Sequence, residues 1–337
     1  MIDLPVLVEN IRGPLVESRH RGCIAVVQPD GRVFAKAGDI SHVTFMRSTA
    51  KPIQALPLLT SGSFDRFGLA ATELAVVVSS HSGEPIHTRE VWSFLRKLGL
   101  DTSYLRCGVH AASDWGAEGK VGGASLDVLQ NNCSGKHAGM LAQCLAEGAE
   151  LARYEQPEHV VQQRILDCVA LLTRTRTIEI GVESCTVPTF AVSVGALALA
   201  YSRLVNPREL PAHLRSACNR VIQAMLDYPE LVGGTEGRSC TQLMNAYGRT
   251  LIAKEGAEGV YALAILPSND FPHGLGIAVK IEDGDNAAAV ITVLETLRQL
   301  SPQPHVHPEQ IDTALNGQLR SFRGTVVGHR RAIFRLS

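Results

Sequence analysis

The sequence has little charge and few aromatic side chains, and these shortages exclude several classes of protein. Charged residues make up 19% of the 337 residues and aromatic residues 5%, whereas about 25% of an ordinary soluble domain is charged. The 32 basic and 33 acidic residues leave a net charge of −1. The chain therefore lacks the long-range field that gathers nucleic acid or an anionic membrane surface, and we expect a small-molecule substrate, no nucleic acid and no membrane.

The sequence also lacks a targeting segment and a long apolar run. Residues 1–5 include an acid and a proline, where a signal peptide would have basic residues followed by an apolar stretch. The most apolar stretch, 190–201, contains Ser193 and Gly195 and is shorter than the about 20 residues that span a bilayer. We therefore expect a cytoplasmic protein.

Eight cysteines are present, and in the cytoplasm we expect buried thiols, metal ligands or catalytic groups rather than disulfides. Four of them lie on segments of apolar periodicity and are expected in the hydrophobic core: Cys23, Cys144, Cys168 and Cys218. Cys133 and Cys185 lie outside such segments and are considered below. Nothing in the sequence assigns a role to Cys107 or Cys240.

Extended runs occur near both ends of the chain, and helical periodicity fills the middle. Two predicted hairpins combine 23–27 with 32–35 and 259–266 with 274–281. Apolar residues three and four apart predict helices at 87–98, 136–145, 161–172, 190–204, 210–225 and 286–300. This order predicts an α+β fold, in which an antiparallel sheet built from both termini is flanked by helices and carries an inserted, mostly helical lobe.

The predicted lobes form one catalytic unit. We place the sheet lobe at about 1–47 plus 250–337 and the helical lobe at about 48–249. Internal repeats, Gly/Ser linkers, a Walker loop, a dinucleotide fingerprint and a Gly-x-Ser-x-Gly elbow are all absent from the sequence. We therefore expect two interlocked lobes rather than two independent domains.

The sharpest local pattern is Ser48-x-x-Lys51. Residues three apart at the start of a helix share one face, so the lysine amine can reach the serine hydroxyl. A serine needs a base to become a nucleophile, and a lysine serves when burial or a second cation keeps its amine neutral. The alternative is a serine that caps a helix, followed by a surface lysine.

Two further elements stand in the order found in serine acylases that use Ser-x-x-Lys. Ser80 lies in a polar loop, and Lys254-Glu255-Gly256 precedes the predicted strand at 259–266. The middle residue of that triplet is Glu, where such enzymes usually have Thr or Ser. Alone, Lys254 is equally explained as a solvated lysine.

A second group of polar residues is Asn131-Asn132-Cys133-Ser134-Gly135-Lys136-His137, at the predicted start of a helix. A thiol at a helix N-terminus beside cations has a lowered pKa and makes a good ligand or nucleophile. Cys185 could meet Cys133, although two cysteines without Cys-x-x-Cys spacing are a poor zinc signature, and from composition alone core thiols are the better interpretation.

Five segments together resemble the rhizobial, thermolabile type of L-asparaginase: 47–52, 79–84, 131–137, 181–185 and 253–259. The resemblance implies hydrolysis of L-asparagine to L-aspartate and ammonia, a fold similar to serine β-lactamases and glutaminases, and a homodimer. It implies Ser48 as the nucleophile with Lys51 as its base, and Ser80 with Lys254 as a second Ser-Lys pair.

The same resemblance implies one zinc ion per chain near the catalytic serine, tuning substrate binding rather than acting as the electrophile. Cys133, Lys136 and Cys185 match the ligand positions, and the lysine can donate only as a neutral amine. The family has Asp where this chain has Glu183, so we expect Glu183 to bind substrate or to neighbour the ligands. The other expected substrate-binding residues are Arg47, His81, Asn132 and His137.

Two alternatives stay open at this point. The first is another Ser-x-x-Lys acylase, either a glutaminase or a penicillin-interacting enzyme. The second is a non-enzymatic zinc or thiol sensor, in which Cys133 and Cys185 are the functional groups and Ser48 caps a helix.

Overall fold

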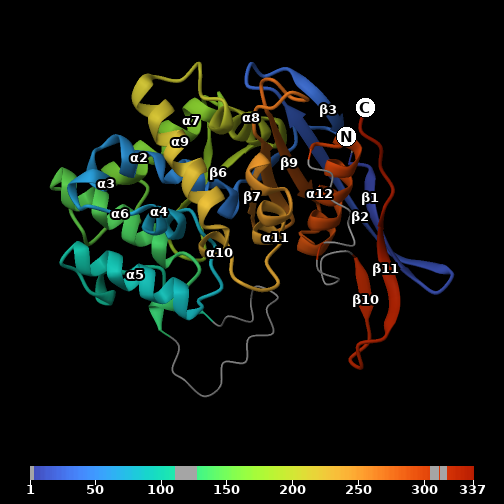
Figure 1. The fold of residues 1–337 in the computed structure, drawn as a ribbon, viewed down its shortest axis with the longest axis horizontal. Coiled ribbons are helices and arrows are strands. Elements are labelled where there is room, and N and C mark those ends of the chain that lie inside the picture. The colour runs from blue at the N-terminus through green and yellow to red at the C-terminus, as the bar shows by residue number, and fades with distance from the viewer. Residues whose placement is uncertain (1–3, 111–126, 304–310, 312–316) are drawn as a thin grey trace. The chain divides into compact units, whose positions relative to one another are not determined.

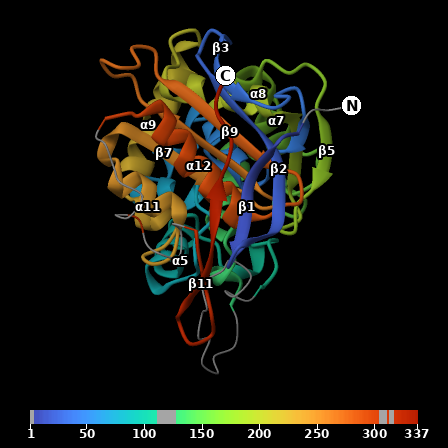
Figure 2. The same cartoon turned by 90° about the vertical axis from the view of Figure 1, so that its right-hand side faces the viewer.

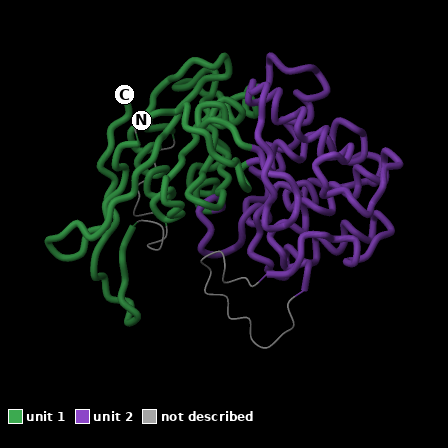
Figure 3. Tube along the Cα trace, turned by 180° about the vertical axis from the view of Figure 1, so that it is seen from behind, with its two compact units in different colours: residues 1–49, 191–206, 242–337 green, residues 50–190, 207–241 purple. Residues whose placement is uncertain are grey.

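The computed structural model describes residues 4–110, 127–303, 311 and 317–337, which divide into two compact units (Figure 3). Unit 1 comprises residues 1–49, 191–206 and 242–337, and unit 2 comprises 50–190 and 207–241. The sequence placed lobe boundaries near residues 47 and 250, and the structure adds 191–206 to the unit that contains the large sheet.

Unit 1 is built on an eight-stranded antiparallel sheet that both ends of the chain supply, as predicted (Figures 1 and 2). Its strands are β1 (Val6–Arg12), β2 (Leu15–Val27), β3 (Val33–Ala37), β7 (Leu251–Glu255), β8 (Val260–Ile265), β9 (Leu275–Ile281), β10 (Gln318–Arg320) and β11 (Val326–Ala332). Their order is β10-β11-β1-β2-β9-β8-β7, and β3 also pairs with β2. The central register pairs Ile24 with Val279, so buried apolar residues of the two termini share one core.

Two helices pack on this sheet. One is α8 (Val194–Val205), against β9, β2 and β8, and the other is α12 (Asn286–Leu300), within the predicted bounds. Gly276 of β9 allows the close approach of α8, because a Cβ atom there would lie 1.9 Å from the Ala198 carbonyl oxygen. Any larger residue at position 276 would push the helix off the sheet.

The prediction of one helix over 190–204 was wrong at its start. Residues Pro188–Ser193 form strand β6, whose Thr44↔Val192 pairing joins it to β4 (Val43–Phe45). The helix begins only after Ser193, whose Oγ accepts a hydrogen bond from Ala196 N at 3.1 Å. This serine is a standard helix N-cap, and the apolar residues before it suit a buried strand equally well.

Three strands were not predicted at the C-terminal end of unit 1. Lys254 lies inside β7, where it pairs with Ala262 of β8, rather than before the first strand of the hairpin. Strands β10 and β11 follow the last predicted helix, and β11 pairs with β1. Their exposed, arginine-rich sequence lacks the apolar alternation that marks a strand.

Unit 2 is mostly helical. Its helices are α1 (Lys51–Gln54), α2 (Leu56–Thr60), α3 (Ser63–Arg66), α4 (Ala71–Val77), α5 (Pro85–Lys97), α6 (Ser134–Glu147), α7 (Val160–Thr173), α9 (Ala212–Asp227) and α10 (Pro229–Val232). Strand β5 (Glu179–Val182) also belongs to it, and α11 (Ser239–Ala246) runs across the chain boundary between the units. Among the described residues, no helix has the length and apolar character of a membrane span.

Helix α4 lies among α5, α6, α9 and α10, and its end determines where the polar residues of unit 2 gather. Gly135, in the first turn of α6, faces the end of α4, because a Cβ atom there would lie 2.2 Å from the Val76 carbonyl oxygen. The start of α6 and the loop that follows α4 are therefore held side by side.

The α4 segment also contains a buried charge whose loss should cost stability. Glu73 is 1% exposed and receives hydrogen bonds from Ala70 N at 2.6 Å and Lys97 Nζ at 2.7 Å. Replacing Lys97 by methionine should lower the free energy of unfolding by about 1 to 3 kcal/mol, because a buried carboxylate loses its charged partner.

Urea denaturation checks this prediction, with Lys36→Met on the exposed face of β3 as the matched control. That control should change the free energy of unfolding by no more than about 0.5 kcal/mol. Equal losses in the two variants would show that Glu73 does not depend on Lys97.

Candidate active site

A lysine at the start of α1 is buried in the polar part of unit 2. Lys51 is 1% exposed, and its Nζ lies 2.6 Å from Ser79 O, 3.1 Å from Asn132 O and 3.0 Å from Ser80 Oγ. Burial lowers the pKa of Lys51, and the nearby Lys136 ammonium lowers it further against the opposing effect of the Cys133 thiol. The amine is thus held beside a serine hydroxyl in a position that favours its neutral form.

The loop that carries Ser80 is fixed by backbone hydrogen bonds. Ser80 N donates to Val232 O at 3.0 Å, and Ser82 N donates to Gly233 O at 2.9 Å. Gly234 packs closely against the loop, because a Cβ atom there would lie 2.4 Å from Ser82 Oγ. The segment after α10 therefore supports this loop.

Two sulfur atoms and a second lysine amine form an adjoining cluster, which we name the Cys-Lys-Cys cluster: Cys133, Lys136 and Cys185. Cys133 is the N-cap residue of α6, and Lys136 lies in its first turn, as predicted. Lys136 Nζ donates to Cys185 Sγ at 3.2 Å. All three side chains are at least 94% buried.

Within the cluster, Cys133 and Cys185 interact through a hydrogen bond between their sulfur atoms. The hydrogen bond between the two sulfur atoms raises the pKa of Cys133 to about 12 and lowers that of Cys185 well below its ordinary value. Burial opposes the charge on Lys136, but the two sulfurs and Glu183 outweigh it and raise the pKa of Lys136. These shifts favour negative charge on Cys185 beside positive charge on Lys136.

These donors fit a zinc ion. Bond lengths of about 2.3 Å to sulfur and about 2.0 Å to nitrogen in a tetrahedral site place the two kinds of donor about 3.5 Å apart, close to the 3.2 Å between Lys136 Nζ and Cys185 Sγ. Among the described residues, no three His, Cys, Asp or Glu side chains gather around one point. The third protein ligand at this position would have to be the lysine amine, deprotonated on binding.

The backbone at Cys185 is strained. Thr186 has a φ of +76°, which is rare for a β-branched residue, and its hydroxyl donates to Arg106 O at 3.1 Å. The hydrogen bond from Thr186 N to Glu183 O, at 2.8 Å, closes the same turn. This turn brings Glu183 and Cys185 to the cluster from a segment far from α6 in the sequence.

In unit 1, Ser48 is half-buried in the short helix η1 (Arg47–Ala50), which leads directly into α1. Arg47 has a φ of +51°, and its Nη1 lies 3.9 Å from Glu258 Oε1. On the other side of Ser48, the Thr49 carbonyl oxygen accepts a hydrogen bond from Tyr201 at 2.8 Å. The residues before and after the serine are thus both anchored.

Lys254 lies in the same unit as Ser48 and is completely buried in β7, where its Nζ donates to Glu255 O at 2.8 Å. A Cβ atom at Gly256, two residues later, would lie 3.2 Å from Thr49 Cγ2. The turn after β7 therefore packs against the residue that follows Ser48.

Three of the expected substrate-binding residues are buried. His81, Asn132 and His137 are at most 5% exposed. The Asn132 carbonyl oxygen faces Lys51, and Asn132 N donates to His110 Nε2 at 3.1 Å. His137 Nδ1 lies 2.6 Å from Tyr154 Oη, and burial lowers the pKa of this histidine to about 3. Within the described part of the chain, His137 Nε2 has no hydrogen-bond partner.

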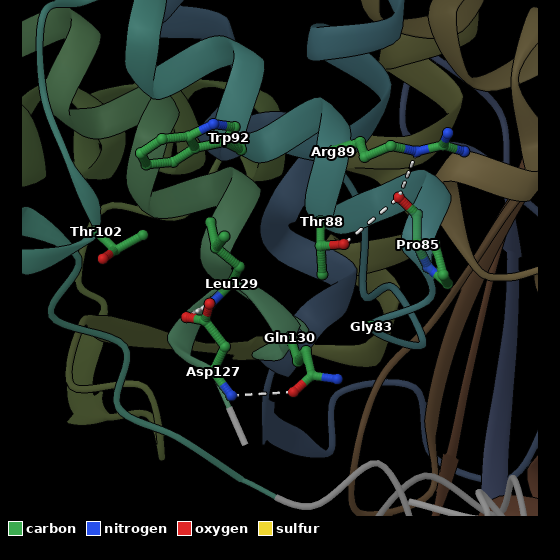
Figure 4. A pocket seen from close by; sticks show the side chains of 9 residues that line it. All are labelled: Gly83, Pro85, Thr88, Arg89, Trp92, Thr102, Asp127, Leu129 and Gln130. Carbon is green, nitrogen blue, oxygen red and sulfur yellow. Dashed lines mark hydrogen bonds between the residues drawn. The ribbon is translucent and has the colours of Figure 1, made fainter. Parts of the chain in front are cut away.

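A pocket of about 640 Å³ lies beside Gly83, in the loop that carries Ser80 (Figure 4). Its lining includes Gly83 of that loop, Trp92, Asp127 and Gln130. The Asp127 carboxylate accepts from Leu129 N at 3.1 Å and so caps a short helical turn. None of the candidate catalytic or metal-binding residues lines this pocket, and its polar groups serve the local backbone.

The sequence missed several residues that hold the site. Asn131 and Ser134 lie inside the 131–137 motif, but the sequence assigned them no role. Asn131 Oδ1 accepts a hydrogen bond from Cys133 N, and Asn131 Nδ2 donates to the Cys107 and Gly108 carbonyl oxygens.

All eight cysteines are buried and form no disulfide, which confirms the four expected in the core. Cys107 is a third thiol near the cluster, and burial together with Cys133 and Cys185 raises its pKa to about 12.

Solved structures that resemble this chain at low similarity include two glutaminases and a protein named Mglu. The covalent complex between Bacillus subtilis glutaminase YbgJ and 5-oxo-L-norleucine is 14% identical, with 88% of this chain and 93% of that chain covered and a TM-score of 0.43. A Bacillus glutaminase in 4.3 M NaCl is 15% identical, with 84% and 92% covered and a TM-score of 0.41. The native form of Mglu is 15% identical, with 90% and 71% covered and a TM-score of 0.45.

Sequence comparison is more specific than structural likeness for this chain. No curated protein matches it. The family model described as L-asparaginase II matches residues 8–332, which is nearly the whole chain. The protein therefore belongs to the L-asparaginase II family, and it is an amidohydrolase.

Proposed function

We propose that the protein hydrolyses L-asparagine to L-aspartate and ammonia through an acyl-enzyme on Ser48. The family match supports the reaction class. The observation that carries the assignment is the buried Lys51 amine, three residues after Ser48 in a continuous helical run. Groups with this spacing share one face of a helix.

Lys51 is the proposed general base. In its neutral form, the amine has two N–H groups for the Ser79 and Asn132 carbonyl oxygens, and a lone pair on the side of the Ser80 hydroxyl that can accept a proton. The two carbonyl oxygens therefore orient the amine, and its lone pair accepts the proton of the serine hydroxyl. A serine activated in this way is the usual nucleophile of Ser-Lys acylases.

In the proposed reaction, Lys51 takes the Ser48 proton while Oγ forms a bond to the side-chain amide carbon of asparagine. The C–N bond then breaks, the nitrogen leaves as ammonia after accepting a proton, and water hydrolyses the ester to release aspartate. Ser48 is the second residue of η1, so its N–H has no acceptor within the helix. That N–H is a suitable donor to the oxyanion, a contribution of about 3 kcal/mol in other acylases.

Ser80 is proposed to return the proton to the leaving nitrogen, because its hydroxyl is the side-chain group 3.0 Å from Lys51 Nζ. Lys254 is proposed as the second lysine of the reaction. Glu183 is proposed to bind the substrate amine and Arg47 its carboxylate, on grounds of charge. A homodimer in the cytoplasm completes the proposal.

We also propose that Cys133, Lys136 and Cys185 hold one zinc ion. A bound zinc ion would supply positive charge, and this would strengthen substrate binding in a buried site. Lys136 must lose a proton to bind it, and both thiols must be thiolates. The hydrogen bond from Lys136 Nζ to Cys185 Sγ supports this proposal, because it brings two of the three proposed ligands together.

Replacing Cys185 by serine should reduce the zinc content from about one ion per chain to a small fraction, because only two of three ligands remain. The KM for asparagine should rise more than kcat falls. Metal analysis of the purified protein and steady-state kinetics check both expectations. Cys168→Ser, a buried cysteine of α7 outside the cluster, should keep its zinc, and equal zinc contents in the two variants would contradict the proposal.

Ammonia release from L-asparagine and L-glutamine tests the proposed substrate. We expect kcat/KM to favour asparagine by about 10- to 200-fold, because rejecting one methylene is worth about 1 to 3 kcal/mol. A preference for glutamine would assign the protein to the glutaminases. A stable mass adduct with penicillin would point to a penicillin-interacting enzyme, and an absence of amidase activity would favour a zinc or thiol sensor.

A further inference from the structure

His81 follows the proposed catalytic Ser80, and both of its ring nitrogens are used inside unit 2. Gly83 N donates to Nδ1 at 3.1 Å, so Nδ1 carries no proton. Nε2 is therefore the protonated nitrogen, and it donates to Ser134 Oγ at 3.0 Å. With 1% of its surface exposed, the neutral ring has no nitrogen left for a substrate.

A second histidine packs against the face of the His81 ring. His87 stacks on His81 with ring centroids 4.9 Å apart and an interplanar angle of 10°. Its Nδ1 accepts from Glu84 N at 3.1 Å, and its Nε2 donates to Glu230 O at 2.9 Å. Both rings are therefore fixed in tautomer and in orientation by the backbone around them.

The other end of the His81 contact lies on α6. Ser134 Oγ donates in turn to Leu129 O at 2.9 Å, which leaves its lone pairs for His81. Ser134 stands between Cys133 and Lys136 in the sequence, so it belongs to the segment that supplies two members of the Cys-Lys-Cys cluster. The His81–Ser134 hydrogen bond thus ties the Ser80 loop to the start of α6.

We propose that His81 is a positioning residue. It holds the Ser80 hydroxyl at its distance from Lys51 Nζ by tying the loop to Ser134, and it does not contact the substrate. This inference rests on the proposed function for its catalytic consequence, but the hydrogen-bond arrangement can be tested without activity.

Two substitutions of His81 distinguish the roles of its two ring nitrogens. His81→Asn keeps an acceptor at the place of Nδ1 and loses the link to Ser134, whereas His81→Gln can place an amide N–H near the position of Nε2. We expect kcat to fall about 10- to 100-fold in His81→Asn, with KM changed less than about threefold and substantial rescue in His81→Gln. Ser134→Ala should reproduce the His81→Asn defect, and the double variant should be no worse than either single one.

A substrate-binding role for His81 predicts a different pattern. In that case KM would rise in both His81 variants, and Ser134→Ala would leave the kinetics unchanged. Additive losses in the double variant would likewise overturn the proposal.

Hydrogen exchange supplies the measurement that does not depend on activity. Amides of residues 79–84 should exchange at least about tenfold faster in His81→Asn and Ser134→Ala than in the wild type, with helix α7 unaffected. Faster exchange in a protein without amidase activity would uphold the positioning role and reject the proposed function. Unchanged exchange in both variants would reject the positioning role itself.

Discussion

Replacing Ser48 by alanine is expected to reduce ammonia release from L-asparagine by at least about 10³-fold, because the reaction loses its nucleophile. The substitution removes one oxygen atom from a half-buried side chain in η1. Its flanking residues remain anchored by the Arg47–Glu258 and Tyr201–Thr49 contacts. We therefore expect a folded protein that retains its zinc and still binds asparagine.

Ser93→Ala is the matched control, because Ser93 lies on the exposed side of α5. Its kcat/KM should stay within about twofold of the wild type, as for most surface substitutions. Ammonia release, far-ultraviolet circular dichroism and zinc content are compared for all three proteins. Activity in Ser48→Ala equal to that of the control would move the nucleophile to another residue.

Replacing Lys51 by methionine or by arginine is expected to lower kcat by about 10³-fold, because neither side chain can accept the serine proton. Arginine is the sharper test. It keeps a cation at this position, but its guanidinium stays protonated, so a purely electrostatic role for Lys51 would preserve activity in that variant. Lys36→Met, on the exposed face of β3, is the control and should be fully active.

The pH dependence provides a second measurement on the same group. Burial lowers the pKa of Lys51, so the neutral amine forms at a lower pH than in a free lysine. The wild-type kcat/KM should therefore rise as pH increases through this lowered pKa. The residual rate of Lys51→Met should lack that rise, and an identical rise in the variant would assign it to another group.

The helical start around Ser48 and the two hairpins could be predicted because they depend on local sequence. The Ser48-x-x-Lys51 spacing needs one helical turn, and the N-terminal hairpin needs alternating apolar residues around a turn. Cys133 and Lys136 were placed correctly at the start of α6 for the same reason. These features require no knowledge of distant contacts.

Other features depend on contacts that no local pattern encodes. Strand β11 lacks apolar alternation, and its partner strand β1 lies more than 300 residues away in the sequence. The left-handed backbone at Arg47 and Thr186 is unusual for these residue types and is stabilised by tertiary contacts. The burial of His81 could not be foreseen either, because a polar loop is normally expected at the surface.

The most direct test of the account is covalent labelling with the diazo-ketone analogue of asparagine, followed by intact-mass measurement and peptide mapping. The proton of the activated hydroxyl passes to the diazo carbon, and the oxygen then displaces dinitrogen from that carbon, so the analogue stays attached to the nucleophile through an ether bond. We predict one label per chain, located on Ser48, which is absent in Ser48→Ala and blocked by excess asparagine. A label on Ser80 or on Cys133, or undiminished labelling of Ser48→Ala, would contradict the assignment of Ser48 as the nucleophile.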